Sequence, residues 1–259
     1  MTRVLVTGST GRVGVHLVRE LRERGAEVHT ALEDMSQVDR VYVCAADGPE
    51  KVARETAVID AAAAAGVERI VKLSAMHADP ASALPVYRWH GEIENHLRKS
   101  GAPAVLLRPA FFMANLLMVA EGVAHGGVVP APTAGRRVAM IDVRDVAACA
   151  AVAVLNEGHE GQAYDLTGPA PITFAEVAAA IAEATGRPVR SLDLTGEQAR
   201  PRFEDAGLPD WLAAHLAGVF GVIRAGGFEH ATGHVEALTG RPARDIGAFA
   251  REHAAAFRP

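Results

Sequence analysis

The 259-residue sequence is poor in cysteine and in lysine. Its two cysteines, Cys44 and Cys149, lie in apolar runs, so we interpret them as buried free thiols in a reducing cytoplasm and not as a disulfide. Only three lysines occur, Lys51, Lys72 and Lys99, beside many arginines. Each lysine is therefore examined separately as a candidate for chemistry.

Two further absences exclude whole classes of protein. The net charge of −5 leaves no basic surface for nucleic acid or for an anionic membrane. No apolar stretch reaches membrane-spanning length, and the first residues enter a strand-like run instead of a signal peptide. Hydrophobic residues make up 49% of the chain, which is ample for a packed core. We expect a globular protein whose partner is a small molecule.

The first half of the chain alternates strand-like runs with helical periodicity, which predicts a parallel sheet covered on both faces. The expected strands are 4–6, 27–31, 41–45, 69–74 and 104–108, and the expected helices are 15–24, 49–65 (apolar face Val52, Thr56, Ile59, Ala63) and 86–99. About ten residues separate the second strand from the third, too few for a helical crossover. The pattern therefore predicts a Rossmann-like, doubly wound α/β fold, shortened after its second strand, in which 33–37 form a bare loop leading to a third strand on the other side of the first.

The second half changes in character from about residue 127, where Pro130 marks a loop. Strands are expected at 138–141, 163–166 and 188–192, and helices at 145–155, 173–185, 209–223 and 245–257. Thr173 and Glu176 form a capping-box pattern. We divide the chain into a domain of residues 1–126 and a smaller α/β lobe of residues 127–259, intertwined in one structural unit.

A glycine-rich turn, GSTGRVG at 8–14, stands between the first strand and the first helix. There, Gly8 allows a tight turn, Gly11 lets a pyrophosphate approach the backbone and Gly14 allows close helix–strand packing. This arrangement is typical of nicotinamide-dinucleotide binding. The residues expected to bind the cofactor follow the first three strands: Gly8, Thr10, Gly11, Arg12, Val13, Gly14, Glu33 and Ala45.

Six segments in order along nearly the whole chain resemble the NmrA-like family of atypical short-chain dehydrogenase/reductases. They are VLVTGSTGRVG, RIVKLSAMHADP, WHGEIENHLRKSG, VLLRPAFFMANLL, VAMIDVRDVAA and AYDLTGPAPITFAEVA. The resemblance implies an NAD(P)-binding Rossmann fold in the first domain and a substrate-binding lobe in the second. It implies either reductase activity or a cofactor-binding regulatory role.

The sequence departs from the family pattern around its second strand. The segment that builds part of the family's adenine pocket is shortened, so loss of the cofactor stays open. Where NADP-binding relatives often have an arginine, this chain has Glu33 and Asp34. A carboxylate beside the ribose favours a 2′-hydroxyl, while Arg12 would offset its charge by reaching a phosphate. Solvated loop charges are an equal alternative, and the form of NAD(P)(H) stays undecided.

The stretch VYRWHGEIENHL, at 86–97, lies where a short-chain dehydrogenase places Tyr-x-x-x-Lys, but Gly91 occupies the lysine position. In short-chain dehydrogenases this lysine lowers the pKa of the tyrosine. A free tyrosine titrates near 10, which is too high for a ready base, and Gly91 cannot lower the pKa of Tyr87. Tyr87, His90 and Glu94 lie beside the apolar stripe of the expected helix. We expect His90 to move the proton, with Glu94 holding its ring. The alternative is a boundary histidine bonded to Glu94.

Other candidates follow the fourth and fifth strands. Ser74 ends the fourth strand, where the resemblance implies a substrate-facing serine. For Lys72 on the same strand, pairing with a carboxylate is favoured over reaching a cleft. The expected catalytic residues are His90, Tyr87 and Ser74, and the expected substrate-binding residues are His77, Phe112, Met113 and Asn115. No metal site is expected, since His90/Glu94 and His230/His234 each offer two ligands without a third.

The expected function is an NAD(P)-dependent oxidoreductase that reduces a small carbonyl, quinone or enone substrate. The cofactor would supply the hydride, and His90, Tyr87 or water the proton. Two alternatives stay open: a non-enzymatic sensor of cofactor or metabolite, and a redox-neutral cyclase or isomerase. Neither nucleic acid nor membrane is expected as a partner, and the alanine-rich helix 145–155 permits a homo-oligomer.

Overall fold

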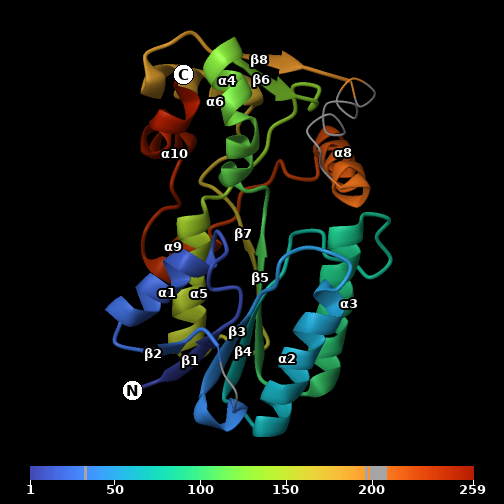
Figure 1. Ribbon diagram of the computed structural model, residues 1–259, viewed down its shortest axis with the longest axis vertical. Coiled ribbons are helices and arrows are strands. Elements are labelled where there is room, and N and C mark those ends of the chain that lie inside the picture. Colours follow the sequence, from blue (N-terminus) through green and yellow to red (C-terminus); the bar gives the residue numbers. More distant parts are fainter. Residues whose placement is uncertain (32–33, 196–197, 199–208) are drawn as a thin grey trace. The chain divides into compact units, whose positions relative to one another are not determined.

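The computed structural model describes residues 1–31, 34–195, 198 and 209–259, and these fall into two compact units. The first unit comprises Met1–Pro109, Val143–Leu166 and His234–Arg241; the second comprises Ala110–Asp142, Thr167–Gly233 and Pro242–Pro259 (Figure 1). The chain thus leaves the first unit earlier than the boundary we set at residue 126, and it returns to that unit twice.

The first unit is built on a six-stranded parallel sheet with the order β2-β1-β3-β4-β5-β7. Its strands are β1 (Arg3–Val6), β2 (Glu27–His29), β3 (Arg40–Val43), β4 (Arg69–Leu73), β5 (Ala104–Pro109) and β7 (Ala163–Leu166). The described residues between β2 and β3 form only a short 3-10 turn, η1 (Met35–Gln37), and β3 pairs with β1 on the side opposite to β2. The predicted doubly wound fold with its shortened crossover is therefore confirmed.

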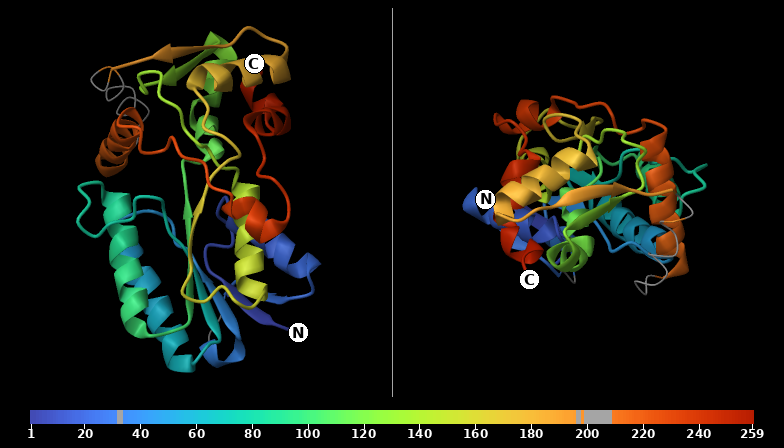
Figure 2. Two further views of the ribbon diagram at one scale, coloured as in Figure 1. Left: turned by 180° about the vertical axis from the view of Figure 1, so that it is seen from behind. Right: turned by 90° about the horizontal axis from the view of Figure 1, so that it is seen from above.

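Helices cover both faces of this sheet. One face carries α1 (Gly14–Glu23), α5 (Val143–Leu155) and α9 (His234–Thr239), and the other carries α2 (Lys51–Ala65) and α3 (Pro85–Ser100) (Figures 1 and 2). Every residue of α5 from Asp145 to Val154 is buried. Small alanine side chains let this helix lie close to the sheet, so the helix that we expected to permit association belongs to the core.

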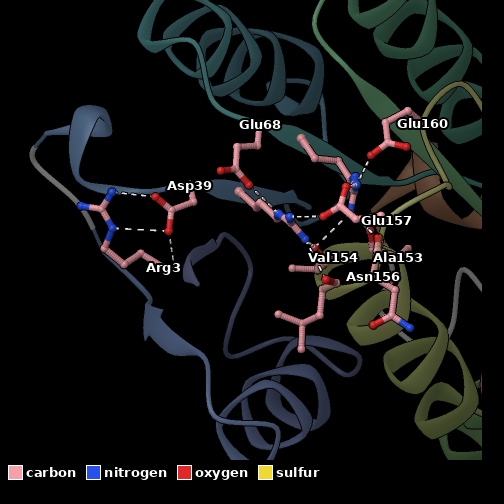
Figure 3. A network of polar contacts seen from close by, with 11 residues as sticks. Arg3, Asp39, Glu68, Ala153, Val154, Asn156, Glu157 and Glu160 are labelled. Carbon is pink, nitrogen blue, oxygen red and sulfur yellow. Dashed lines mark hydrogen bonds and ion pairs between the residues drawn. The ribbon is translucent and has the colours of Figure 1, made fainter. Parts of the chain in front are cut away.

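Two arginines at the amino ends of strands bind the carbonyl end of α5, where Figure 3 labels Val154, Asn156 and Glu157. Arg40, the first residue of β3, donates to the carbonyls of Val154 and Leu155 at 2.8 Å each. Arg69, the first residue of β4, donates to the carbonyl of Asn156 at 2.5 Å. Both guanidinium groups also contact Glu157, whose pKa they lower. The arginine N–H groups thus satisfy the last carbonyls of the helix, and their positive charge stabilises the negative end of the helix dipole.

The second unit holds a two-stranded parallel sheet of β6 (Val128–Ala131) and β8 (Arg190–Asp193). Its helical segments are η2 (Met113–Val119), α4 (Ala120–Gly126), α6 (Phe174–Thr185), α8 (Asp210–Arg224), α10 (Ile246–Glu252) and η3 (Ala254–Phe257). The capping box at the start of α6 is confirmed, because Thr173 and Glu176 each bond to the other's backbone N–H.

Three expectations for the second half were wrong. Pro130 lies in β6 and not in a loop; a two-stranded sheet has only edge strands, which tolerate a residue without an N–H. Residues 138–141 make only isolated bridges, Val138 with Ile172 and Ile141 with Phe112. The helix expected at 245–257 is interrupted at His253. In the part of the chain that the structure describes, no helix has the length and apolar character needed to cross a bilayer.

Candidate functional site

The order β2-β1-β3 creates a switch point at the carboxyl ends of β1 and β3, where doubly wound sheets bind their ligands. Thr7 joins these two strand ends. Its hydroxyl donates to the carbonyl of Cys44 at 3.0 Å and accepts from the Cys44 N–H at 2.8 Å. The turn after β1 and the loop after β3 are therefore held side by side.

The glycine turn is built so tightly that side chains are excluded at two positions. Gly8 has a φ of +64°, and a Cβ there would lie 2.7 Å from the Cys44 carbonyl oxygen. A Cβ on Gly14 would lie 2.1 Å from the Gly8 carbonyl oxygen. Inside the turn, the Gly11 N–H donates to that same oxygen at 2.9 Å. Helix α1 thus begins directly against the end of β1, as the sequence predicts.

This turn fits the phosphates of a dinucleotide. No side chain caps the amino end of α1 at Val13, and its first turn contains no acidic residue. Gly8, Thr10, Gly11 and Arg12 are exposed, whereas Val13 and Gly14 are buried and offer only their backbone. Exposed glycines before a helix N-terminus without a side-chain cap leave room and partial positive charge for an anion.

The residues expected near the ribose are only partly described. Glu33 lies outside the described residues. Asp34 caps η1, since its side chain accepts from the Ser36 N–H at 2.9 Å, and this bonding to Ser36 lowers the pKa of Asp34. Asp34 is thus engaged in local structure.

Ala45, the remaining residue of the expected cofactor set, is held through both of its backbone groups. Its N–H donates to Glu55 Oε1 at 2.9 Å, and its carbonyl accepts from Lys51 Nζ at 2.7 Å. Lys51 and Glu55 lie 2.9 Å apart, and their side chains are 2% and 1% exposed. A buried ion pair therefore fixes the loop after β3.

Helix α3 cannot carry a lysine at position 91, where the Tyr-x-x-x-Lys pattern requires one. A Cβ on Gly91 would lie 2.2 Å from Pro80 N and 2.3 Å from the Asp79 carbonyl carbon. The loop that contains these two residues is tied to α3, because the Asp79 N–H donates to the carbonyl of Tyr87 at 3.0 Å. Tyr87 is buried, and burial raises its pKa well above the usual value. The Tyr-x-x-x-Lys arrangement is therefore excluded by close backbone packing.

Ser74 is directed at Glu94. The Ser74 hydroxyl donates to Glu94 Oε1 at 2.6 Å, and Arg108 donates to the two oxygens of Glu94 at 2.9 Å and 2.6 Å. The bonding to Glu94 raises the pKa of Arg108. We expected Glu94 to hold the ring of His90, but the structure gives both of its oxygens other donors.

His90 instead contacts a lysine of the sheet. Lys72 Nζ lies 3.2 Å from His90 Nδ1 and 2.7 Å from Glu55 Oε2. Lys72 is fully buried, and His90 is 6% exposed. The predicted pairing of Lys72 with a carboxylate is thus confirmed. The four side chains of Lys51, Glu55, Lys72 and His90, here called the lysine cluster, join α2, β4 and α3.

Sequence reasoning missed Lys51 and Glu55. The buried positions of α2 are Lys51, Glu55, Ile59 and Ala62, so the helix is rotated from the apolar face that we expected. The available signal was the spacing of four between Lys51 and Glu55, together with a strand lysine that needed a buried partner.

The expected substrate-binding residues are divided between the two units. His77, in the first, is exposed with a φ of +66°, and its ring centroid lies 5.9 Å from that of Tyr87. Phe112 and Asn115, in the second, are half-buried. Met113 is 1% exposed and its N–H donates to the Ile141 carbonyl, which makes it a core residue of that unit. Among the described residues, no group of three His, Cys, Asp or Glu side chains is placed to hold a metal ion.

Comparisons with known proteins agree with this geometry. The chain is 36% identical to an NAD(P)H azoreductase of Xenophilus azovorans, over 98% of this chain and 99% of that protein. It is 35% identical to a (4-alkanoyl-5-oxo-2,5-dihydrofuran-3-yl)methyl phosphate reductase of Streptomyces griseus, over 99% of each chain.

A solved structure also resembles the whole chain. The NADPH-dependent quinone oxidoreductase QOR2 of Escherichia coli, in complex with NADPH, superposes with a TM-score of 0.85 at 26% identity, over 96% of this chain and 99% of that one. The model of the NmrA-like family matches residues 29–237. The glycine turn, the switch point and these matches together establish that the chain belongs to the NmrA-like family.

Proposed function

We propose that this protein is an NAD(P)-dependent oxidoreductase that reduces a small quinone, enone or carbonyl substrate. The observation that carries the proposal is the glycine turn at the switch point, where a Cβ on Gly14 would overlap the Gly8 carbonyl. Such a close approach of a helix to a strand end is the arrangement that places a dinucleotide pyrophosphate on a helix N-terminus. The relatives named as an NAD(P)H azoreductase and a (4-alkanoyl-5-oxo-2,5-dihydrofuran-3-yl)methyl phosphate reductase support the same chemistry.

The absence of a lysine at position 91 favours some acceptors within this class. Addition of hydride to a simple ketone creates a strongly basic alkoxide, which needs an acid close by. Addition to a quinone or an enone creates an anion that is delocalised over the acceptor, so water or a weak acid suffices. Because burial raises the pKa of Tyr87 and Gly91 excludes a neighbouring lysine, quinones and enones suit this site better than simple ketones.

The chain's own residues have separable tasks in this reaction. The glycine turn and the N-terminus of α1 would hold the phosphates of NAD(P)H, which would supply the hydride when bound. The ion pair of Lys51 and Glu55 orients Ala45 beside the turn. Ser74, fixed by Glu94 and Arg108, keeps hydroxyl lone pairs that can accept a hydrogen bond at the carboxyl end of β4.

The test is calorimetric titration with NADPH, NADP+, NADH and NAD+, followed by assays of cofactor oxidation with a naphthoquinone, an azo dye, a cyclic enone and a simple ketone. We expect micromolar binding of one cofactor pair and turnover that is slowest with the ketone. Gly14→Ala should weaken cofactor binding by at least about tenfold, or ~1.4 kcal/mol.

Gly122→Ala is the matched control, because a Cβ at that position meets nothing within 4 Å in the part of the chain that the structure describes. Circular dichroism would verify that both variants are folded. If none of the four nucleotides binds to the wild-type protein, the proposal is refuted. Binding without any turnover would instead favour a cofactor-sensing protein.

A further inference from the structure

The fully buried ammonium group of Lys72 contacts three other groups. Nζ lies 2.7 Å from Glu55 Oε2 and 3.2 Å from His90 Nδ1, and it donates to the carbonyl of its neighbour Leu73. An ammonium has three N–H donors and no acceptor. The ion pair with Glu55 keeps Lys72 protonated, so the nitrogen of His90 that faces it has to be the acceptor.

This contact determines the protonation of the imidazole. A neutral histidine carries its proton on one ring nitrogen, and the hydrogen bond made by the other nitrogen decides which. With Nδ1 accepting from Lys72, the proton of His90 is on Nε2. A second proton on Nδ1 would place two donors 3.2 Å apart in a buried site, so the ammonium disfavours imidazolium.

Lys72 also contacts helix α3 at His90, next to Gly91, the position from which a lysine side chain is excluded. Gly91 cannot carry a side chain, because a Cβ there would overlap the backbone at Asp79 and Pro80. Lys72 comes from the neighbouring strand β4 and meets α3 one residue earlier, at His90. The same helix therefore receives an ammonium group from the sheet.

We propose that Lys72 is a positioning residue for proton transfer: it holds His90 with its proton on Nε2 and replaces that proton through Nδ1 when His90 protonates the reduced substrate. The proposal rests on the reductase function given above. After the cofactor's hydride has reduced the acceptor, the Nε2–H bond breaks as a new bond to hydrogen forms on the substrate anion. The Nζ–H bond of Lys72 breaks as Nδ1–H forms.

The step balances in atoms and charge. His90 stays neutral but changes tautomer, Lys72 becomes an amine, and the substrate anion becomes neutral. A solvent proton that enters at Nε2 after product release reverses the relay and restores the ammonium. Glu55 remains a carboxylate throughout and stays paired with Lys51 at 2.9 Å, so no isolated buried charge is left behind.

The surroundings of Lys72 are suited to this exchange. Its charged and titratable neighbours are Glu55 and Lys51 from α2, Cys44 from the end of β3, and His90 from α3. Burial lowers the pKa of Lys72, and Lys51 acts in the same direction, while Glu55 and Cys44 oppose them. The ammonium therefore gives up a proton more readily than an exposed lysine.

The first test replaces Lys72 by Met, which keeps the length and the apolar stem of the side chain. In Lys72→Met we expect kcat for a simple ketone, whose alkoxide needs an acid close by, to fall by about tenfold or more, with the Kd for NADPH changed less than about twofold. The dependence of kcat on pH should change as well. Lys99→Met is the matched control, since Lys99 is exposed on α3, and it should behave as wild type.

A second variant separates the relay from a purely structural role. Lys72→Arg retains a cation and donors for His90, but a guanidinium does not release its proton in proteins. We expect Lys72→Arg to keep cofactor binding but to leave kcat as low as in Lys72→Met. Full restoration of kcat in Lys72→Arg would overturn the relay, and an unchanged kcat in Lys72→Met would overturn the role of Lys72 altogether.

The tautomer can be measured without turnover. Nitrogen-15 NMR of histidine-labelled protein, with His90 assigned by comparison with His90→Gln, should show a neutral ring protonated on Nε2. This signature should be lost in Lys72→Met. A wild-type ring protonated on Nδ1 would overturn the proposal. A wild-type protein that reduces no acceptor refutes the proposed function, whereas a turning-over enzyme that is insensitive to Lys72→Met refutes only this inference.

Discussion

Replacing Gly91 by Ala tests whether close backbone packing excludes a side chain, and therefore a lysine, from position 91 of α3. A glycine inside a helix usually costs stability, so Gly→Ala in a helix interior gains about 1 kcal/mol. Gly91 should show the opposite sign. Its Cβ would lie 2.2 Å from Pro80 N, 2.3 Å from the Asp79 carbonyl carbon and 2.7 Å from Asp79 Cα. All three are backbone atoms, which no side-chain rotation can move away.

The magnitude follows from the overlap. Overpacking in a tight interior typically costs about 1–3 kcal/mol, and more where backbone has to move. After the gain in helix propensity is subtracted, we expect Gly91→Ala to lower the free energy of unfolding by about 2 kcal/mol. For a chain of this size, that corresponds to a fall in Tm of roughly 4–8 °C.

Urea unfolding followed by tryptophan fluorescence can localise this effect. The two tryptophans lie in different units, Trp89 in α3 and Trp211 in α8. In a Trp211→Phe background, fluorescence therefore reports the unit that contains Gly91. The midpoint should fall in Gly91→Ala without a change in slope.

The matched control is Gly221→Ala, inside α8, where a Cβ meets no atom of the described residues within 4 Å. Its own free energy of unfolding, measured with Trp211 present, should be unchanged or higher by up to about 1 kcal/mol. If Gly91→Ala were as stable as the wild type, the close approach of the 79–80 loop to α3 would be refuted. Room for a lysine at residue 91 would then have to be reconsidered.

Two further substitutions test buried charges. Arg69→Met removes donors from the carbonyl end of α5 and should lower the free energy of unfolding by about 2–4 kcal/mol in urea titrations; a loss below about 0.5 kcal/mol would contradict the anchoring role. Burial disfavours the charged form of Glu55, but Lys72 and Lys51 outweigh this effect and lower the pKa of Glu55. The ion pairing of Glu55 therefore stabilises the fold fully above the unfolded pKa of about 4.3, and this stabilisation is lost as the pH falls through the lower folded pKa. The stability difference between wild type and Glu55→Gln should therefore be largest near neutral pH and shrink below about pH 4, and a difference independent of pH would contradict the ion pairing.

Local spacing was sufficient to predict the sheet and its cofactor turn. Strand-like runs that alternate with helical periodicity indicate a parallel sheet, because parallel strands need covered faces and long crossovers. The short interval between β2 and β3 predicted that β3 lies on the other side of β1, as observed. The glycines of 8–14 predicted the close approach that Gly8 and Gly14 make.

The second half of the chain was less predictable, since its elements are short and their order is irregular. Pro130 was interpreted as a loop residue because proline disfavours central strands, yet β6 belongs to a sheet of only two strands. The amino-acid composition of Val143–Leu166 and His234–Arg241 also did not indicate that these segments belong to the first unit. Whether a helix belongs to one unit or the other depends on which element its apolar face packs against. The spacing of apolar residues shows that a helix has such a face but not what the face contacts.

The sequence by itself determined that β3 lies on the other side of β1 from β2, the position of the glycine turn and the presence of a lysine in β4. Only the tertiary structure decided which polar groups meet: Lys72 with Glu55 and His90, and Glu94 with Ser74 and Arg108. It also decided that Gly91 faces backbone. The reason is that the backbone geometry of helices and strands repeats every few residues, so the spacing of apolar residues along the sequence indicates it. The partners of buried side chains depend on the rotation of each helix over the sheet, which a shift of one residue in the α2 face is enough to change.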